Sequence, residues 1–88
     1  MNERSSLLEF PCWFPVKAVG ESIADFDACV VAVIRRHVAD VQEGAVSVRA
    51  SKAGRYTAVT VMIRADSQQQ LDAIYQDLSA CPQVLMAL

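Results

Sequence analysis

A short loop between two alternating segments is the feature that most constrains the fold of this chain. In Arg55 to Ala65, the apolar side chains Val59, Val61 and Ile63 recur at every second position, as in a strand with one buried face. Ala45 to Ser51 alternates in the same way. The connection Lys52-Ala53-Gly54 fits a short hairpin loop with Gly54 in the left-handed conformation. Two adjacent antiparallel strands are therefore predicted.

An amphipathic helix is predicted before this hairpin. Apolar residues recur at spacings of three and four from Ile23 to Ile34, which favours one buried helix face. Ser22 and Asp25 have the spacing of a capping box, so we expect the helix to start there. It should fade between Val38 and Val41.

A second helix is predicted after the hairpin. Ser67 and Gln70 again have capping-box spacing, and Pro82 should stop the helix. The expected buried stripe comprises Leu71, Ile74, Tyr75 and Leu78.

Two further strands complete the pattern, one from Phe14 to Gly20 and one from Val84 to Leu88. The order β-α-β-β-α-β predicts an α+β, ferredoxin-like domain, with two helices on one face of a four-stranded antiparallel sheet. Right-handed crossovers place the first and third strands at the centre. We expect this single domain to span residues 10–88, preceded by a polar arm over residues 1–9.

Composition excludes several classes of protein. The 88 residues carry 8 Lys+Arg against 10 Asp+Glu, and 53% are hydrophobic, which is typical of a folded domain rather than a general nucleic-acid or anionic-membrane binder. No apolar run approaches the roughly 18–20 residues of a membrane span. No signal peptide is recognisable, so we expect a cytoplasmic protein. The three cysteines lack a disulfide pattern and are expected to be reduced, buried thiols.

Catalytic and metal-binding patterns are not found in the sequence. The only histidine, His37, follows Cys29 by eight residues on the predicted helix, which separates their Cα atoms by about 12 Å. That is too far for a nucleophile and its base. The cysteines match no metal-ligand spacing, and the glycines form no phosphate-binding motif. We expect no enzymatic activity, metal or cofactor.

Two binding surfaces follow from the predicted fold. The exposed sheet face would carry Lys17, Arg49, Tyr56 and Arg64, a set that suits a protein partner or, with weaker support, single-stranded RNA. The turn Gly20-Glu21-Ser22 would lie at a helix N-terminus, where backbone N–H groups bind carboxylates or phosphates.

Motifs at both ends and in the hairpin resemble one family along nearly the whole chain. They are Leu7-Leu8-Glu9-Phe10-Pro11-Cys12-Trp13-Phe14-Pro15-Val16-Lys17, Ser51-Lys52-Ala53-Gly54-Arg55-Tyr56 with Val59-Thr60-Val61, and Val84-Leu85-Met86. Together they resemble the YbeD family of small bacterial proteins, although Ala58 stands where that family's hairpin pattern has a serine. The resemblance implies a ferredoxin-like fold similar to ACT regulatory domains, and a gene-neighbourhood link to lipoate metabolism that no residue here supports.

These observations lead to three hypotheses of different classes. The first is an ACT-like regulatory or adaptor domain, homodimeric, that binds a small carboxylate metabolite at Gly20, Glu21 and Ser22 or docks on a partner enzyme. This assignment rests on analogy between folds. The second is a protein-interaction module that uses the sheet face of Lys17, Arg49, Tyr56 and Arg64, or an edge strand. RNA binding through the same face is a third, weaker alternative.

Overall fold

The computed structural model describes residues 8–88, so the predicted arm of residues 1–9 lies almost entirely outside the described residues. The elements follow the predicted order and include one additional 3-10 turn. They are β1 (Cys12–Glu21), α1 (Phe26–Arg35), η2 (Glu43–Ala45), β2 (Val46–Ala50), β3 (Tyr56–Ala65), α2 (Gln68–Ala80) and β4 (Val84–Ala87).

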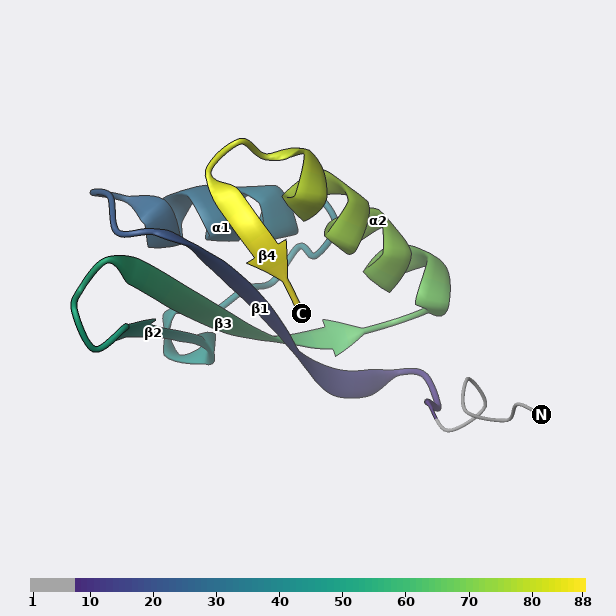
Figure 1. Ribbon diagram of the computed structural model, residues 1–88. Helices are drawn as coiled ribbons and strands as arrows, with labels where there is room; N and C mark the ends of the chain where they lie inside the picture. Colours follow the sequence, from purple (N-terminus) through teal and green to yellow (C-terminus); the bar gives the residue numbers. More distant parts are fainter. Residues whose placement is uncertain (1–7) are drawn as a thin grey trace.

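The four strands form one sheet in the order β2-β3-β1-β4, with every neighbouring pair antiparallel. The prediction that the first and third strands are central is confirmed. Ten consecutive pairs join β1 to β3, from Cys12 opposite Ala65 to Glu21 opposite Tyr56. Figure 1 shows both helices on the same side of the sheet, which leaves the other side uncovered.

The hydrophobic core lies between the sheet and the two helices. Alternation in β3 buries Val59, Val61 and Ile63, as predicted, each at 2% exposure or less. The helices bury most of their predicted apolar faces against these strands, but Tyr75 of the predicted stripe in α2 is only partly buried. The helical core residues are Phe26, Val30, Val33 and Ile34 in α1 and Leu71, Ile74 and Leu78 in α2.

The predicted capping box at Ser22 is wrong. The helix begins four residues later, at Phe26, and its N-cap Asp25 has a left-handed backbone (φ 66°) without a side-chain cap. Ser22 instead extends the pairing of β1, because its N–H donates to the Arg55 carbonyl (2.9 Å) and its Oγ hydrogen-bonds Thr57 Oγ1 (2.7 Å). Ile23 therefore precedes the helix and is 49% exposed.

The first helix also ends earlier than predicted. It stops at Arg35, although Val38 and Val41 stay buried in the loop that follows. The Arg36 N–H bonds back to the Val33 carbonyl and tightens the last turn, and the Arg35 guanidinium donates to the Val41 carbonyl at 3.2 Å. These contacts hold the loop against the core without helical geometry.

The cap of the second helix is confirmed. Ser67 is the N-cap of α2, and its Oγ accepts a hydrogen bond from the Gln70 N–H at 3.1 Å. The Gln70 side chain accepts from the N–H of Asp66, one residue before the position of an ideal capping box. The helix ends at Ala80, two residues before Pro82, and Gly54 in the hairpin has the expected positive φ of 74°.

Candidate functional site

The turn after β1 is closely packed at Gly20. A Cβ atom at this position would lie 2.3 Å from the Gln83 carbonyl oxygen and 2.6 Å from two ring atoms of Phe26. Glycine therefore allows Phe26 and the start of β4 to approach the strand backbone. The side of Gly20 that faces the core is occupied by protein atoms.

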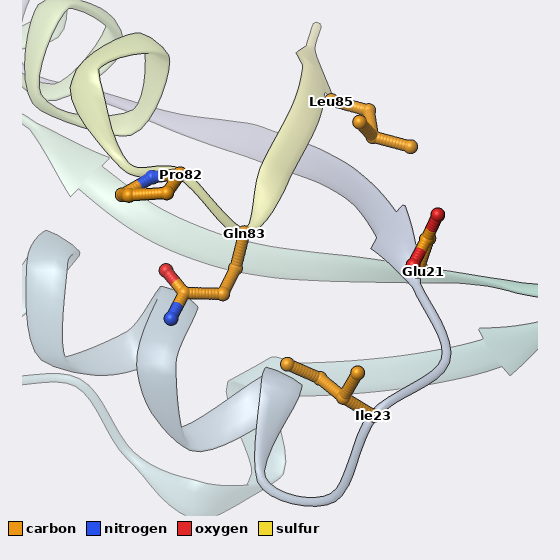
Figure 2. Close-up of a pocket in the computed structure, with 5 residues that line it drawn as sticks. All are labelled: Glu21, Ile23, Pro82, Gln83 and Leu85. Atoms are coloured by element: carbon orange, nitrogen blue, oxygen red, sulfur yellow. The ribbon is translucent and has the colours of Figure 1, made fainter.

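A shallow depression lies beside this turn. It has a volume of about 290 Å³ and is lined by Glu21, Ile23, Pro82, Gln83 and Leu85, which Figure 2 shows as sticks. Of the three residues predicted to bind a carboxylate, Glu21 alone lines it. None of these five lining residues is a cation, and the N–H of Ser22 is already bonded to Arg55. The Glu21 side chain brings a negative charge to the depression, and no lining residue brings a positive charge that would attract a carboxylate ligand. Carboxylate binding at Gly20, Glu21 and Ser22 stays a prediction.

The four residues of the predicted interaction surface lie on one face of the sheet. In the register, Lys17 is opposite Thr60, Arg49 is opposite Ala58, and Tyr56 is opposite Glu21. Paired residues of antiparallel strands share a face, and Arg64 belongs to the same alternating set of β3. We call this surface the open sheet face. Its residues are Trp13, Pro15, Lys17, Val19, Glu21, Ser47, Arg49, Tyr56, Ala58, Thr60, Met62, Arg64, Met86 and Leu88.

Large apolar side chains are exposed on the open sheet face. Trp13 is 70% exposed and lies opposite Arg64, and Met62 is 41% exposed and lies opposite Pro15. Met86 pairs with Val19, and Leu88 exchanges two backbone hydrogen bonds with Lys17. Trp13 was not predicted as part of this surface because the strand was expected to begin at Phe14. Its position four residues before Lys17, in the same alternation, is the signal that identifies it.

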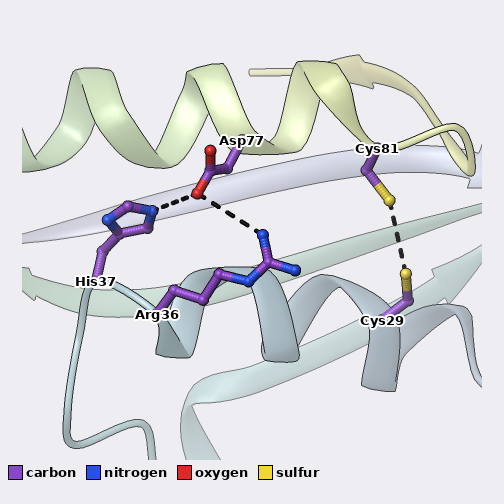
Figure 3. Close-up of polar contacts among 5 residues, drawn as sticks. All are labelled: Cys29, Arg36, His37, Asp77 and Cys81. Atoms are coloured by element: carbon purple, nitrogen blue, oxygen red, sulfur yellow. Dashed lines mark hydrogen bonds and ion pairs between the residues drawn. The ribbon is translucent and has the colours of Figure 1, made fainter.

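A groove between the two helices carries a separate polar cluster (Figure 3). Asp77 of α2 accepts a hydrogen bond from His37 Nε2 at 2.6 Å and lies 3.8 Å from an Arg36 guanidinium nitrogen. The sulfur atoms of Cys29 and Cys81 lie 3.7 Å apart. The groove has a volume of about 380 Å³ and is lined by both cysteines, Arg36 and Asp77.

The expectation of three buried cysteines is wrong, because all three are partly exposed. Desolvation by burial, and then the adjacent Cys81 thiol, raise the pKa of Cys29 above the ordinary value of 9.0, while Arg36 lowers it to a smaller extent. Spacing places Cys29 and Arg36, seven residues apart, on one side of the first helix, and Asp77 and Cys81, four apart, on one side of the second. This spacing does not show that the two sides meet.

Two further observations concern residues 8–88 alone. No helix in this range is long and apolar enough to cross a membrane. The same residues contain no cluster of three or more His, Cys, Asp or Glu side chains that could hold a metal ion.

Curated bacterial proteins are similar to the chain along nearly its full length. A UPF0250 protein of Chromobacterium violaceum is 44% identical over 87 residues, which cover 99% of this chain and 98% of that protein. UPF0250 proteins of Paraburkholderia phytofirmans and Neisseria gonorrhoeae are 43% and 38% identical, over 94% and 90% of this chain and 93% and 87% of theirs.

The fold is similar to a solved structure. The solution structure of protein HP0495 from H. pylori has a TM-score of 0.74, with 12% identity over 92% of this chain and 85% of that one. The family model described as "Protein of unknown function (DUF493)" matches residues 5–88. These matches confirm the resemblance found in the sequence: the chain belongs to the DUF493 (UPF0250, YbeD) family.

Proposed function

We propose that this protein is a non-enzymatic docking domain. Its open sheet face binds a segment of a partner protein, and that segment carries both acidic and apolar side chains. The observation that carries the proposal is the exposure of Trp13 and Met62 among Lys17, Arg49 and Arg64 on the face that no helix covers. The proposal combines two expectations from the sequence. One is a protein-interaction module that uses the sheet face, and the other is an adaptor domain that docks on a partner protein.

The apolar residues support a protein partner. Trp, Tyr and Arg are enriched among the residues that dominate binding energy in protein interfaces. Trp13 is 70% exposed and is paired with Arg64 on the neighbouring strand. Tyr56 is 39% exposed and is paired with Glu21 on the neighbouring strand. Burial of an exposed aromatic ring on association releases water from a large apolar area.

The charges support an acidic partner. The open sheet face carries three cations, Lys17, Arg49 and Arg64, against the single acid Glu21. The whole chain has a net charge of -2, so this face departs in sign from the rest of the protein. Two copies that packed these faces together would bring like charges into contact, which disfavours a homodimer through this surface. The expected homodimer stays a prediction and would use another surface, such as an edge strand.

The non-enzymatic part of the proposal rests on the placement of reactive groups. On the open sheet face, the hydroxyl groups of Ser47, Tyr56 and Thr60 have no histidine beside them. His37 instead hydrogen-bonds Asp77, and it lines a separate depression with Trp13 and Arg64 that contains none of these hydroxyl groups. A regulatory site for a carboxylate metabolite has less support, because Glu21 would repel the ligand.

A photo-crosslinking amino acid in place of Met62 tests the proposal in cells of the native bacterium. We expect ultraviolet light to join this position to a protein segment rich in Asp or Glu, with the sites identified by mass spectrometry. The same amino acid at Asp27, an exposed position on α1, is the background control.

Charge reversal then tests the electrostatic part. Lys17→Glu and Arg49→Glu should each reduce the crosslinked product several-fold, and rising salt should do the same. Lys52→Glu makes the same change of charge in the exposed hairpin loop and should leave the product unchanged. Crosslinks to RNA, crosslinks to a second copy of the chain, or a product no stronger than at Asp27 would each contradict the proposal.

A further inference from the structure

The two sulfur atoms in the helix groove belong to different elements and meet through the fold. Cys29 lies on α1, and Cys81 follows the last residue of α2, 52 residues later. We infer that Cys29 and Cys81 are a thiol pair that small disulfide molecules oxidise to a reversible intramolecular disulfide. This site is separate from the open sheet face, because it lies in the helical layer on the other side of the sheet (Figures 1 and 3).

The geometry requires little movement. The sulfur atoms are 3.7 Å apart, and a disulfide bond is about 2.05 Å long, so they must approach by about 1.7 Å. Cys81 is the cap residue beyond α2 and has an extended backbone, with φ -80° and ψ 122°. A side chain at such a position can rotate without disturbing helical hydrogen bonds.

The side chain of Gln83 lies beside both thiols. Its Oε1 lies 3.0 Å from Cys81 Sγ and 3.9 Å from Cys29 Sγ, so it accepts from one thiol and lies near the other. Both cysteines are partly exposed and line the groove of about 380 Å³, through which a small reagent reaches them. Two cysteines that served only as core packing would be fully buried.

The reaction proceeds by two exchanges. The Cys81 thiolate attacks one sulfur of a low-molecular-weight disulfide, a mixed disulfide forms, and one small thiolate leaves. Cys29 then loses its proton and attacks the Cys81 sulfur, which forms the protein disulfide and releases the second small thiolate. The two protons of the protein thiols pass to the leaving thiolates, so two electrons move from the protein to the reagent. Cys81 is placed first because it lies beyond the end of α2, whereas Cys29 lies within α1. Desolvation by burial, which raises the pKa of Cys29, also disfavours its thiolate in the first exchange.

Oxidation would join α1 to the turn between α2 and β4. A bond that closes a loop of this length restricts the unfolded chain strongly. We expect the disulfide to raise the melting temperature by on the order of 10 °C. An excess of small thiol should reverse the change.

The experiment exposes the purified, reduced protein to glutathione buffers of increasing disulfide content. Trypsin places each cysteine in its own peptide, with Cys12 in residues 5–17, Cys29 in 18–35 and Cys81 in 65–88. Non-reducing mass spectrometry therefore identifies the bond in the unmodified sequence. The expected product joins peptides 18–35 and 65–88, and it melts at a higher temperature than the reduced protein.

Single variants provide the controls. Cys12→Ser should keep the bond and the rise in melting temperature, whereas Cys29→Ser should stop at a stable mixed disulfide on Cys81. The inference is overturned if the wild type accumulates that mixed disulfide without closing the bond, or if Cys12 is one of the bonded residues. It is also overturned if all three thiols stay free in fully oxidised glutathione.

Discussion

The close packing at Gly20 predicts that Gly20→Ala, which adds a single methyl group, strongly lowers the free energy of unfolding. In Gly20→Ala, the new methyl group would lie 2.3 Å from the Gln83 carbonyl oxygen and 2.6 Å from the Phe26 ring. The oxygen belongs to the backbone, and Phe26 is only 2% exposed, so neither group moves aside easily. Overpacking of a tight core typically costs 1–3 kcal/mol, and we place this substitution at about 3 kcal/mol.

Urea unfolding at equilibrium measures this loss. A decrease of about 3 kcal/mol in the free energy of unfolding corresponds to a fall of roughly 12–24 °C in melting temperature for a domain of this size. The matched control is Gly44→Ala, because a Cβ at Gly44 meets no atom within 4 Å. That variant should stay within about 0.5 kcal/mol of the wild type.

A double-mutant cycle separates the two halves of the contact. Phe26→Leu removes the ring atoms that face Gly20 and leaves the Gln83 oxygen in place. The double variant should therefore be more stable than the sum of the single effects predicts, by about 1 kcal/mol. A Gly20→Ala variant within about 0.5 kcal/mol of the wild type would refute the close approach of β1, Phe26 and β4.

Three other tests concern the hairpin turn, the predicted helix caps and the Cys29 thiol. Gly54→Ala should lower the free energy of unfolding by about 1 kcal/mol in urea titrations, because φ at this position is 74°; a neutral result would contradict the left-handed turn. Ser67→Ala should lower it by about 1 kcal/mol through loss of the α2 cap, whereas Ser22→Ala should lower it by less than about 0.5 kcal/mol, and equal losses would contradict the two assignments. Because desolvation by burial raises the pKa of Cys29, the folded, reduced protein holds the thiol proton more tightly than the unfolded chain does. This stabilising contribution is fully present below the ordinary thiol pKa of 9.0, and it is lost as the pH rises through the pKa of Cys29 in the folded state. Urea titrations between pH 8 and 10.5 in excess reductant should therefore show a decline that is shallower in Cys29→Ser, and parallel curves would exclude the effect.

The strands and their faces were predictable because burial on one side of a sheet leaves a two-residue period in the sequence. The same period placed Lys17, Arg49, Tyr56 and Arg64 together, although they come from three strands. Alternation within each strand assigns its residues to the two faces. When the strands pair in the correct register, the residues of the same set come together on one face of the sheet.

The start of α1 was not predictable from local spacing. Ser22 has the sequence context of a helix cap, but it bonds Thr57, 35 residues away, because the register of β1 and β3 brings the two hydroxyl groups together. Ser67 has the same spacing pattern and does cap its helix. The difference lies in tertiary pairing, which the capping pattern does not contain.

The helix groove was missed for a related reason. His37 meets Asp77 across 40 residues, and Cys29 meets Cys81 across 52. Periodicity identifies the buried face of each helix but does not fix how far one helix lies along the other. Contacts at the rim of a helix pair depend on that offset.

The position of β1 at the centre of the sheet has a consequence for synthesis on the ribosome. Both neighbours of this strand, β3 and β4, follow it in the chain, and its pairing with β3 begins only at Tyr56. On the ribosome, β1 therefore emerges with both edges unpaired, while β2 and β3 can form their hairpin locally. Stalled nascent chains that end before Tyr56 should be cleaved readily by protease within β1, and chains that extend beyond Leu88 through a linker should be protected. Equal protection of the short and the long nascent chains would show that β1 is protected from protease before β3 and β4 have been synthesised.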